Sequence, residues 1–377
     1  MKHYSIFLVI TILFCFSCGT KKEDDCKGMT LQVDLREQSV SWAELFSHAE
    51  IIPLETQDSC LIMNMERILL HEGQLYVFGQ RKPAVYAFDE HGTFLREITR
   101  KGEGPGEYQA VTDILIDRID ERIVLLCPFG YVLFYDMDGR FLEQKVLPMK
   151  PNYYSITSLS DSAFALWSCV EENETGISVI DKNSMATTYE TWYNDRMLDM
   201  GLMKPFYPFD GESYFSTAYQ HTVYRVKSDS LESAYSWDFG KDNINPGQLL
   251  SYTKIENAGA RNNQILKDLE EGVLPYAMER HNQNNRFYYV ALRKGVGRDR
   301  PWINVFYRKQ DGKSFVFEQT CENLKIRPLL FTDDFLLSIL SPEDMDAYSK
   351  ILPEKEYAKF SSYSTDDNPW LIKFYFK

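Results

Sequence analysis

The sequence predicts an all-β fold, a six-bladed β-propeller, from its composition, an internal repeat and the content of each copy. The chain is rich in residues that strands prefer, with 24 Tyr, 24 Phe and 6 Trp among 377 residues. Segment 67–98 recurs at 113–146, where Phe88 falls on Tyr135, so the period is about 47 residues. Each copy contains four short β-runs separated by turn residues, which is the content of one propeller blade.

The first copy shows the pattern most clearly, with β-runs at 68–71, 75–78, 85–88 and 94–98. Gly92, and Gly139 in the second copy, end acidic tetrapeptides that suit hairpin turns, because glycine accepts a positive φ. Two such hairpin pairs are also compatible with a duplicated sandwich. The weaker copies at 155–192 and 206–238 continue the pattern and favour the propeller.

The last two blades are interrupted by helical segments. We expect an insertion at 245–285 in the fifth blade, with a helix near 262–272, a start at Pro246 and a stop at Gly272. The expected strands that follow are 286–293, 302–308 and 314–319 in the fifth blade, and 329–332, 335–340 and 370–376 in the sixth, with an acidic helical segment at 342–360. The sixth blade lacks one strand, and an N-terminal strand at 29–35 or 49–54 is expected to close the ring.

The N-terminus predicts export. Lys2, an apolar run at 6–16 and the small residues around Cys18 form a signal peptide over 1–17, too short to span a bilayer. Cys18 resembles the lipidated cysteine of a bacterial lipoprotein box, although an ordinary secretory peptide is the alternative. Lys22, Glu23, Asp24 and Asp25 resemble the export tag of surface lipoproteins of Bacteroidota, and a plain solvated tether is the alternative.

These segments predict three parts: the signal peptide at 1–17, an acidic surface tether at 18–28 and the propeller at 29–377. We expect an outer-membrane lipoprotein, exposed at the cell surface or, alternatively, facing the periplasm. The formal charge of −14 argues against nucleic acid and against a basic membrane-binding patch. The charge says little about a neutral sugar or peptide partner. We expect a glycan or peptide ligand and a monomeric protein.

The cysteines predict no metal cluster. Beyond Cys15 and Cys18 the chain has five, none in CxxC spacing, and their disulfide pairing cannot be deduced from sequence. They are Cys26, Cys60, Cys127, Cys169 and Cys321.

Four segments together resemble a known family. They are the residues Ile51 to Thr56, Phe88-Asp89 with Gly92 and Phe94-Leu95, the run GEGPGEY at 102–108, and Asp367-Asn368-Pro369. In these the chain is similar to the six-bladed β-propeller lipoproteins of Bacteroidota, of NHL/TolB-like type, over nearly its whole mature length. The resemblance implies the fold and a cell-surface address. Members of that family largely lack an assigned reaction, so it implies no catalytic residues.

The glycine-rich run invites a phosphate-loop interpretation, which the sequence does not support. A Walker loop needs Gly-Lys-Ser/Thr at a helix start, whereas Gly106 precedes Glu107 and Tyr108. We expect instead the connection from the outer strand of one blade to the inner strand of the next, with tight turns at the glycines and a buried tyrosine ring. Its residues are Gly102, Gly104, Pro105, Gly106, Glu107 and Tyr108.

Two groups of residues are candidates for a ligand face. One is aromatic and interrupted by prolines, with inter-blade core packing as the alternative: Trp192, Tyr193, Phe206 and Tyr207. The other is the basic loop RKGVGRDR, with a solvated hairpin tip as the alternative: Arg293, Lys294, Arg298 and Arg300.

No catalytic or metal-binding constellation is visible. The six histidines are scattered without HxH or HxxxH spacing, no carboxylate pair stands out, and no DxDxDG loop is present. We expect no cofactor, with calcium in the axial channel as an unsupported possibility. The predicted function is a lipid-anchored binding or scaffolding module for glycans or peptides. The alternatives are a propeller enzyme of lyase, lactonase or glycoside-acting type, with an axial metal or carboxylate site, and an envelope signalling or assembly component.

Overall fold

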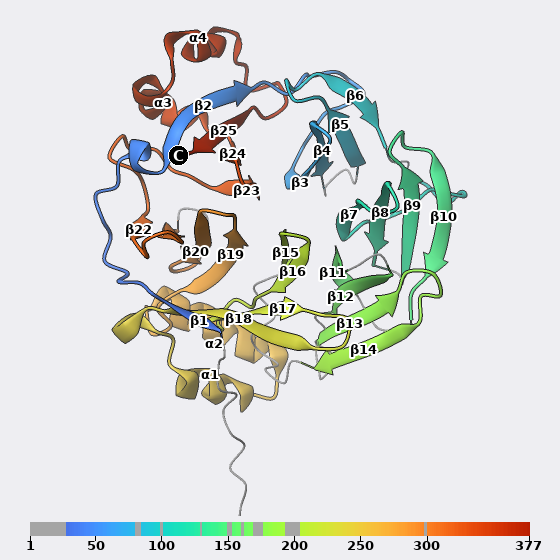
Figure 1. Ribbon diagram of the computed structural model, residues 1–377, viewed down its shortest axis with the longest axis horizontal. Coiled ribbons are helices and arrows are strands. Elements are labelled where there is room, and N and C mark those ends of the chain that lie inside the picture. The colour runs from blue at the N-terminus through green and yellow to red at the C-terminus, as the bar shows by residue number, and fades with distance from the viewer. Residues whose placement is uncertain are drawn as a thin grey trace, which may run out of the picture.

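The computed structural model confirms a six-bladed β-propeller, with six sheets arranged around a central axis (Figure 1). It describes residues 28–79, 84–98, 101–128, 130–148, 153–159, 162–168, 176–192, 204–297 and 300–377, apart from the side chains of Trp192 and Ala258. Each blade is antiparallel, and in blades one to five its strands follow one another outward from the axis in chain order.

The first three blades are the most regular. Blade one contains β3 (Met65–His71), β4 (Gln74–Gly79), β5 (Ala84–Phe88) and β6 (Phe94–Glu97). Blade two contains β7 (Asp113–Asp117), β8 (Arg122–Cys127), β9 (Tyr131–Asp136) and β10 (Phe141–Val146). Blade three contains β11 (Tyr153–Ser158), β12 (Ala163–Ser168), β13 (Gly176–Asp181) and β14 (Thr187–Trp192).

The last three blades carry the additions. Blade four contains β15 (Phe206–Phe209), β16 (Glu212–Phe215), β17 (Thr222–Val226) and β18 (Leu231–Asp238). Blade five contains β19 (Ala277–Gln283), β20 (Phe287–Arg293), β21 (Trp302–Arg308) and β22 (Ser314–Phe317). Blade six contains β23 (Pro328–Phe331), β24 (Phe335–Ile339), β25 (Leu371–Phe376) and, outermost, β2 (Phe46–Ile52).

The ring is closed by β2, which pairs antiparallel with β25. The expected strand exchange is therefore present, and of the two candidate segments the later one performs it. The earlier segment forms β1 (Met29–Gln32), which pairs parallel with β18 as a fifth strand of blade four. Closure leaves no free sheet edge between the first and last blades.

Residues 33–45 run along the outside of blade five, between β1 and β2. Val33 N donates to Asp238 O of blade four at 2.9 Å, and Gln38 N donates to Val316 O of blade five at 2.8 Å. The short helix η1 (Trp42–Glu44) follows, with Ser41 as its capping residue. We call residues 29–52 the N-terminal belt, because they join blades four, five and six.

The helical insertion before blade five differs from the prediction. It holds two helices, α1 (Pro246–Thr253) and α2 (Ala258–Glu270), capped by Asn245 and Asn257 and preceded by η2 (Gly240–Asp242). They lie between β18 and β19, so the insertion ends well before residue 285 and precedes the blade's first strand. Sequence reasoning missed β19 because most of its residues, AMERHNQ, are polar.

In blade six, the helical segment between β24 and β25 matches the expectation. It comprises η3 (Pro342–Asp344), α3 (Met345–Ile351), α4 (Glu354–Tyr357) and η4 (Ala358–Ser362). None of the described helices combines the length and apolar character that crossing a bilayer requires.

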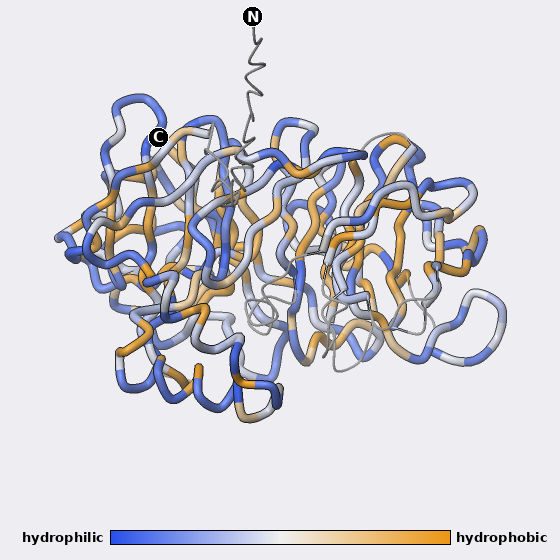
Figure 2. The backbone as a smooth tube through the Cα atoms, turned by 90° about the horizontal axis from the view of Figure 1, so that it is seen from below, coloured by the Kyte–Doolittle hydropathy of each residue, from blue (hydrophilic) through white to orange (hydrophobic). Residues whose placement is uncertain are grey.

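The core lies between neighbouring blades, and Figure 2 shows apolar residues recurring along the strands while the turns at both faces are mainly hydrophilic. At the closure, the Phe46 ring lies 5.5 Å from Phe374, 5.4 Å from Phe376 and 6.4 Å from Phe306. Burying each such ring contributes about 1.5–3 kcal/mol. The same contacts that hold the core therefore also seal the ring.

Candidate functional site: an axial recess above a buried ionic cluster

All six inner strands, with the turns that follow them, line one recess of about 560 Å³. We call it the axial recess. Its aliphatic and aromatic wall comes from Leu69, Leu70, Leu115, Ile116, Ile119, Leu159, Pro208, Phe209, Leu330 and Phe331. Because each blade contributes its own inner strand, six separate segments of sequence converge on this one space.

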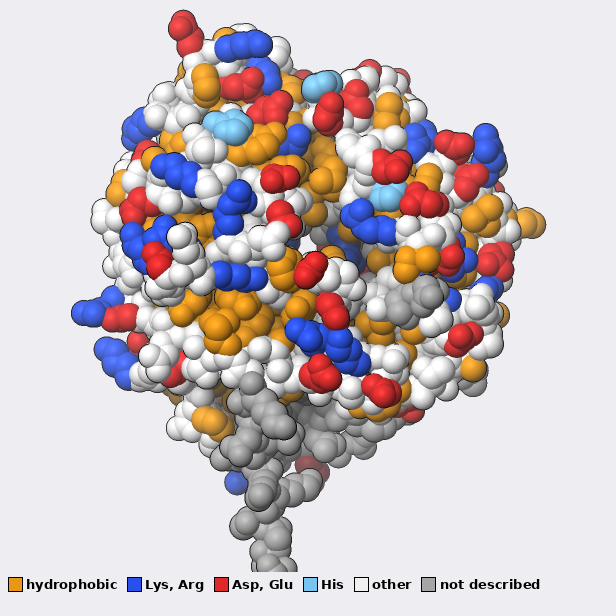
Figure 3. Space-filling model, in the orientation of Figure 1, with side chains coloured by type: hydrophobic (Ala, Val, Ile, Leu, Met, Phe, Trp, Pro, Cys, Tyr) orange, Lys and Arg blue, Asp and Glu red, His pale blue; other side chains and the backbone are white. Residues whose placement is uncertain are grey.

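Polar side chains interrupt that wall. Arg67, Thr157 and Gln283 lie on the inner strands, Arg118, Asp210 and Asp333 lie at the turns, and Glu212 begins β16. Ile119, at the β7–β8 turn, is 56% exposed. Figure 3 shows one axial face hollowed near its centre, with hydrophobic, basic and acidic side chains around the hollow. A concave, mostly apolar space with a few convergent polar groups is typical of ligand pockets.

Arg67 connects the recess to a buried ionic cluster centred on Asp113. The Asp113 side chain is fully buried and forms an ion pair with Arg67 Nη1. Its carboxylate also accepts from Ser155 Oγ at 2.8 Å, from Ile156 N at 3.1 Å and from Ile114 N at 3.0 Å. Burial alone would raise the pKa of Asp113, but the Arg67 and Lys204 cations and these hydrogen bonds outweigh it and hold the pKa below its usual range.

Two further cations approach this cluster. Lys204, just before β15, places Nζ 3.7 Å from Asp113 Oδ1. Burial lowers the pKa of Lys204, with Asp113 opposing and Arg67 adding to the effect. Arg280, on β19, donates from Nη1 to Pro328 O at 2.5 Å, and burial lowers the pKa of its guanidinium too. The cluster therefore gathers basic groups of blade one and of the segment before blade four around one acid of blade two, with Arg280 of blade five close to Lys204.

At the rim, His71, Glu72 and Glu121 place one potential ligand atom each within 4.8 Å of one another, the arrangement that a metal ion needs. His71 Nε2 lies 3.0 Å from Glu121 Oε2, and Arg118 Nη1 lies 3.4 Å from His71 Nδ1. The arginine can only donate, so His71 Nδ1 accepts its hydrogen bond. The protonated nitrogen of the ring is then Nε2, which donates to the Glu121 carboxylate. This arrangement suits a link between blades one and two better than a metal site.

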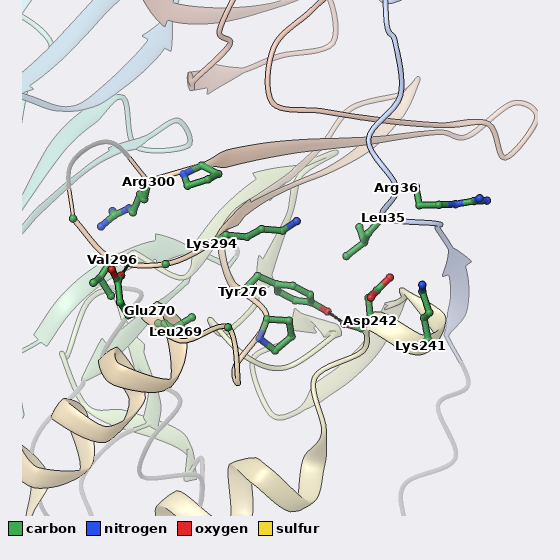
Figure 4. A pocket seen from close by; sticks show the side chains of 15 residues that line it. Leu35, Arg36, Lys241, Asp242, Leu269, Glu270, Tyr276, Lys294, Val296 and Arg300 are labelled. Atoms are coloured by element: carbon green, nitrogen blue, oxygen red, sulfur yellow. Dashed lines mark hydrogen bonds between the residues drawn. The ribbon is translucent and has the colours of Figure 1, made fainter.

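A second recess, of about 920 Å³, lies at the periphery and we call it the peripheral recess. It is bordered by the belt, η2, the end of α2 and the loop after β20 (Figure 4). In Figure 4 Lys294 extends over the Tyr276 ring, whereas Arg36 points away. Arg36 is paired with Asp34, and Arg300 lies 3.5 Å from Glu279. Charges of both signs line it, and fewer of its lining residues are large and apolar than in the axial recess.

The residues expected at a ligand face do not come together. Phe206 and Tyr207 are buried in the core, Phe206 against Phe215 at 5.7 Å and Tyr207 with its hydroxyl 2.8 Å from that of Tyr235. Trp192 ends β14, while Tyr193 and Arg298 lie outside the described residues. Arg293 is paired with Glu279 at the end of β20, and among the described basic residues of the loop Lys294 and Arg300 border a recess.

The glycine-rich run 102–108 lies between β6 and β7, away from both recesses. Gly104 N donates to Glu107 Oε2 at 2.8 Å, and Gly102 N donates to Tyr108 O at 3.1 Å. A Cβ on Gly102 would lie only 1.9 Å from the Glu107 carboxylate. Tyr108 is 1% exposed, and Tyr135 Oη donates to Gly106 O at 2.5 Å. Here the glycines make room for a carboxylate of the same loop.

The other residues that the sequence singled out lie outside the described residues: Cys18, Lys22, Glu23, Asp24 and Asp25, together with Cys26 and Cys169. Cys60, Cys127 and Cys321 are free thiols, the first two buried and the third exposed.

Sequence reasoning missed the ionic cluster, although the repeat contained a signal for it. Arg67, Asp113 and Ser155 are the first residues of the first three repeat copies. Equivalent positions of adjacent blades lie side by side around the axis, so a basic, an acidic and a hydroxyl residue at one repeat position predict a polar cluster there.

The fold and this site together define a closed six-bladed propeller with a ligand-sized recess on its axis. The chain belongs to the DUF4934 family, described as a domain of unknown function, whose model matches residues 30–375.

Two solved structures to which the chain is similar come from Bacteroides. A Bacteroides fragilis structure, described as that of an exported protein, is similar at a TM-score of 0.78 and 19% identity, covering 93% of this chain and 100% of that one. A DUF4221 member from Bacteroides vulgatus is similar at a TM-score of 0.51 and 10% identity, covering 91% and 99%. At these identities the likeness concerns the fold. No curated protein is detectably similar to the chain.

Proposed function

We propose that the protein is an exported, envelope-anchored binding module that takes an apolar segment of a peptide into the axial recess. The observation that carries this is the convergence of all six inner strands on one apolar space of ligand size. A rigid closed ring positions these side chains without ordering a loop, which reduces the entropic cost of binding.

The lining favours peptide over glycan within that proposal. Sugar rings are usually held by exposed aromatic faces, whereas the apolar part of this wall is chiefly leucine and isoleucine, with Phe209 and Phe331 as its aromatic members. Arg67 and Gln283 are among the polar groups that would orient a peptide backbone. The rim charges Arg118, Asp210 and Asp333 would contact its flanking residues.

The test is a screen of the mature protein against matched arrays of apolar octapeptides and of glycans, followed by titration of the best binder. Ile119→Lys places a charge at the recess, and we expect it to weaken peptide binding at least tenfold. Leu250→Lys is the matched control, because Leu250 is 58% exposed on α1, outside the recess. Equal affinity in both variants, or binding of glycans alone, would contradict the peptide proposal.

The anchor forms the second part of the proposal and rests on the N-terminal sequence. A diacylated Cys18 would hold the protein at the membrane, since each buried methylene contributes about 0.8 kcal/mol. Cys18→Ala should move the protein from the membrane fraction to the soluble fraction, and unchanged retention would refute the anchor. If Lys22 to Asp25 direct surface export, protease added to intact cells should digest the protein, and replacing the four residues by alanine should protect it.

A further inference from the structure

The ionic cluster on the axis contains more basic than acidic groups. Arg67 and Lys204 both approach the carboxylate of Asp113 within ion-pair distance. Arg280 lies near enough to lower the pKa of Lys204, as Arg67 does. Two cations therefore lie against one buried anion, with a third cation close by.

Asp113 has no capacity left for a hydrogen bond from Lys204. Its two oxygens already accept from Arg67, Ser155, Ile114 and Ile156. A carboxylate offers about four acceptor positions. This explains why Lys204 Nζ stays 3.7 Å away, at ion-pair distance without a hydrogen bond.

Lys204 thus carries a buried ammonium that lacks an acceptor. Its Nζ is shielded from solvent and has no hydrogen-bond partner in the described part of the chain, although the whole side chain is 25% exposed. The nearest other group is the Phe78 ring, whose centroid is 5.4 Å from Nζ. An ammonium has three protons to donate, and burying it with none of them accepted is costly.

We propose that Lys204 Nζ, together with Arg67 and Arg280, forms an anion-binding site on the propeller axis that accepts an oxygen of a carboxylate, sulfate or phosphate group. The surplus cation supplies the charge and the unused ammonium protons supply the hydrogen bonds. Arg67 borders both this site and the axial recess, so the anion is either free in solution or an acidic group of the ligand that fills the recess.

The first experiment uses sodium sulfate and sodium phosphate as probes, titrated into the mature protein at constant ionic strength. Calorimetry and the thermal unfolding midpoint report binding. The wild type should show saturable stabilisation, and Lys204→Met should weaken the anion at least tenfold. Lys241→Met, at the peripheral recess, is the control and should bind like the wild type. Absence of saturable binding, or equal binding by Lys204→Met, would overturn the proposal.

Stability without the anion gives an independent readout. In anion-free buffer Lys204→Met should unfold at the same denaturant concentration as the wild type or at a higher one, because it removes an ammonium that lacks an acceptor. A tenfold or larger drop in the folding equilibrium constant would show that Lys204 is needed only as a structural partner of Asp113, and would overturn the proposal.

A third comparison separates the two sources of the anion. Apolar peptides with a free C-terminal carboxylate and their C-terminal amides are titrated into the wild type and into Lys204→Met. If the acidic group belongs to the recess ligand, only the free acids lose affinity in the variant. If the two forms bind alike while sulfate still binds, the site serves a free anion. Failure of all peptides to bind would count against the peptide proposal alone.

Discussion

Lys182 Nζ lies 2.8 Å from Asp117 Oδ1, and the two side chains are 1% and 0% exposed. Asp117 ends β7 in blade two, and Lys182 follows β13 in blade three, so this buried ion pair joins neighbouring blades. Arg122 Nη2 reaches the other oxygen of Asp117 at 3.3 Å. The three charges form a second interior ionic group, distinct from that around Asp113.

Lys182→Met should destabilise the protein by about 3–5 kcal/mol, because it leaves the buried Asp117 with only one cation. The combination Lys182→Met with Asp117→Asn should recover much of that loss, since no uncompensated charge then remains. Chemical denaturation of the two variants measures the difference. Equal losses in the single and double variants would show that packing, rather than charge, stabilises this contact.

Gly92→Ala should be far more damaging than Gly73→Ala, although both glycines have positive φ values, 88° and 75°. A Cβ on Gly92 would lie 2.1 Å from Pro53 O, whereas nothing lies within 4 Å of a Cβ on Gly73. Adopting a left-handed conformation costs an alanine about 1–2 kcal/mol at either site. Only Gly92→Ala also disrupts the contact between blade one and the segment after β2. Similar unfolding midpoints for the two variants would contradict this.

Phe46→Ala should cost about 3–5 kcal/mol, because it opens a cavity where β2 meets blades five and six. Phe141→Ala, on the outer strand of blade two, is the control and should cost less, since Phe141 is 38% exposed. Limited proteolysis should cut the Phe46 variant first within the N-terminal belt. If cleavage instead begins in another blade, the cavity left by Phe46→Ala has not made the pairing of β2 with blade six the least stable part of the ring.

The free energy of unfolding should decrease as the pH falls from about 6.5 to about 4, because two histidines are held neutral in the fold. Burial lowers the pKa of His221 to about 4 and that of His281 to about 3. The unfolded chain then binds more protons than the native one within this window, so acidification favours unfolding. Denaturation at pH 7.5 and pH 4.5 measures the loss, which His281→Gln should reduce. A loss confined to pH values below 3.5 would implicate carboxylates instead.

The sequence predicted the parts of the fold that repeat and missed the parts where a strand is polar. The copies at 67–98 and 113–146 match blades one and two because inter-blade packing demands apolar residues at fixed positions. The strand β19 could not be recognised, since most of its residues, among them Glu279, Arg280 and Asn282, are polar and it lacks an apolar alternation.

The candidate site could be predicted only in part. The match of Arg67 with Asp113 and Ser155 at one repeat position was visible in the alignment, and the geometry of a ring brings such residues together. No such signal marked Lys204. It lies before β15, in the connection that enters blade four, and not at the repeat position of Arg67, Asp113 and Ser155. The aromatic run near Phe206 suggested a ligand face from composition alone, but composition does not tell on which side of a blade a ring lies.

The N-terminal belt has a mechanical consequence. Because β1 is paired with β18 along its whole length, a force that pulls on Gly28 must first break the hydrogen bonds of that pairing. Beyond β1 the same force meets the contacts with blade five before it reaches the closure at β2. A load on the N-terminus therefore meets three blades in succession, and the contacts with blades four and five must fail before the closing strand is pulled from the ring.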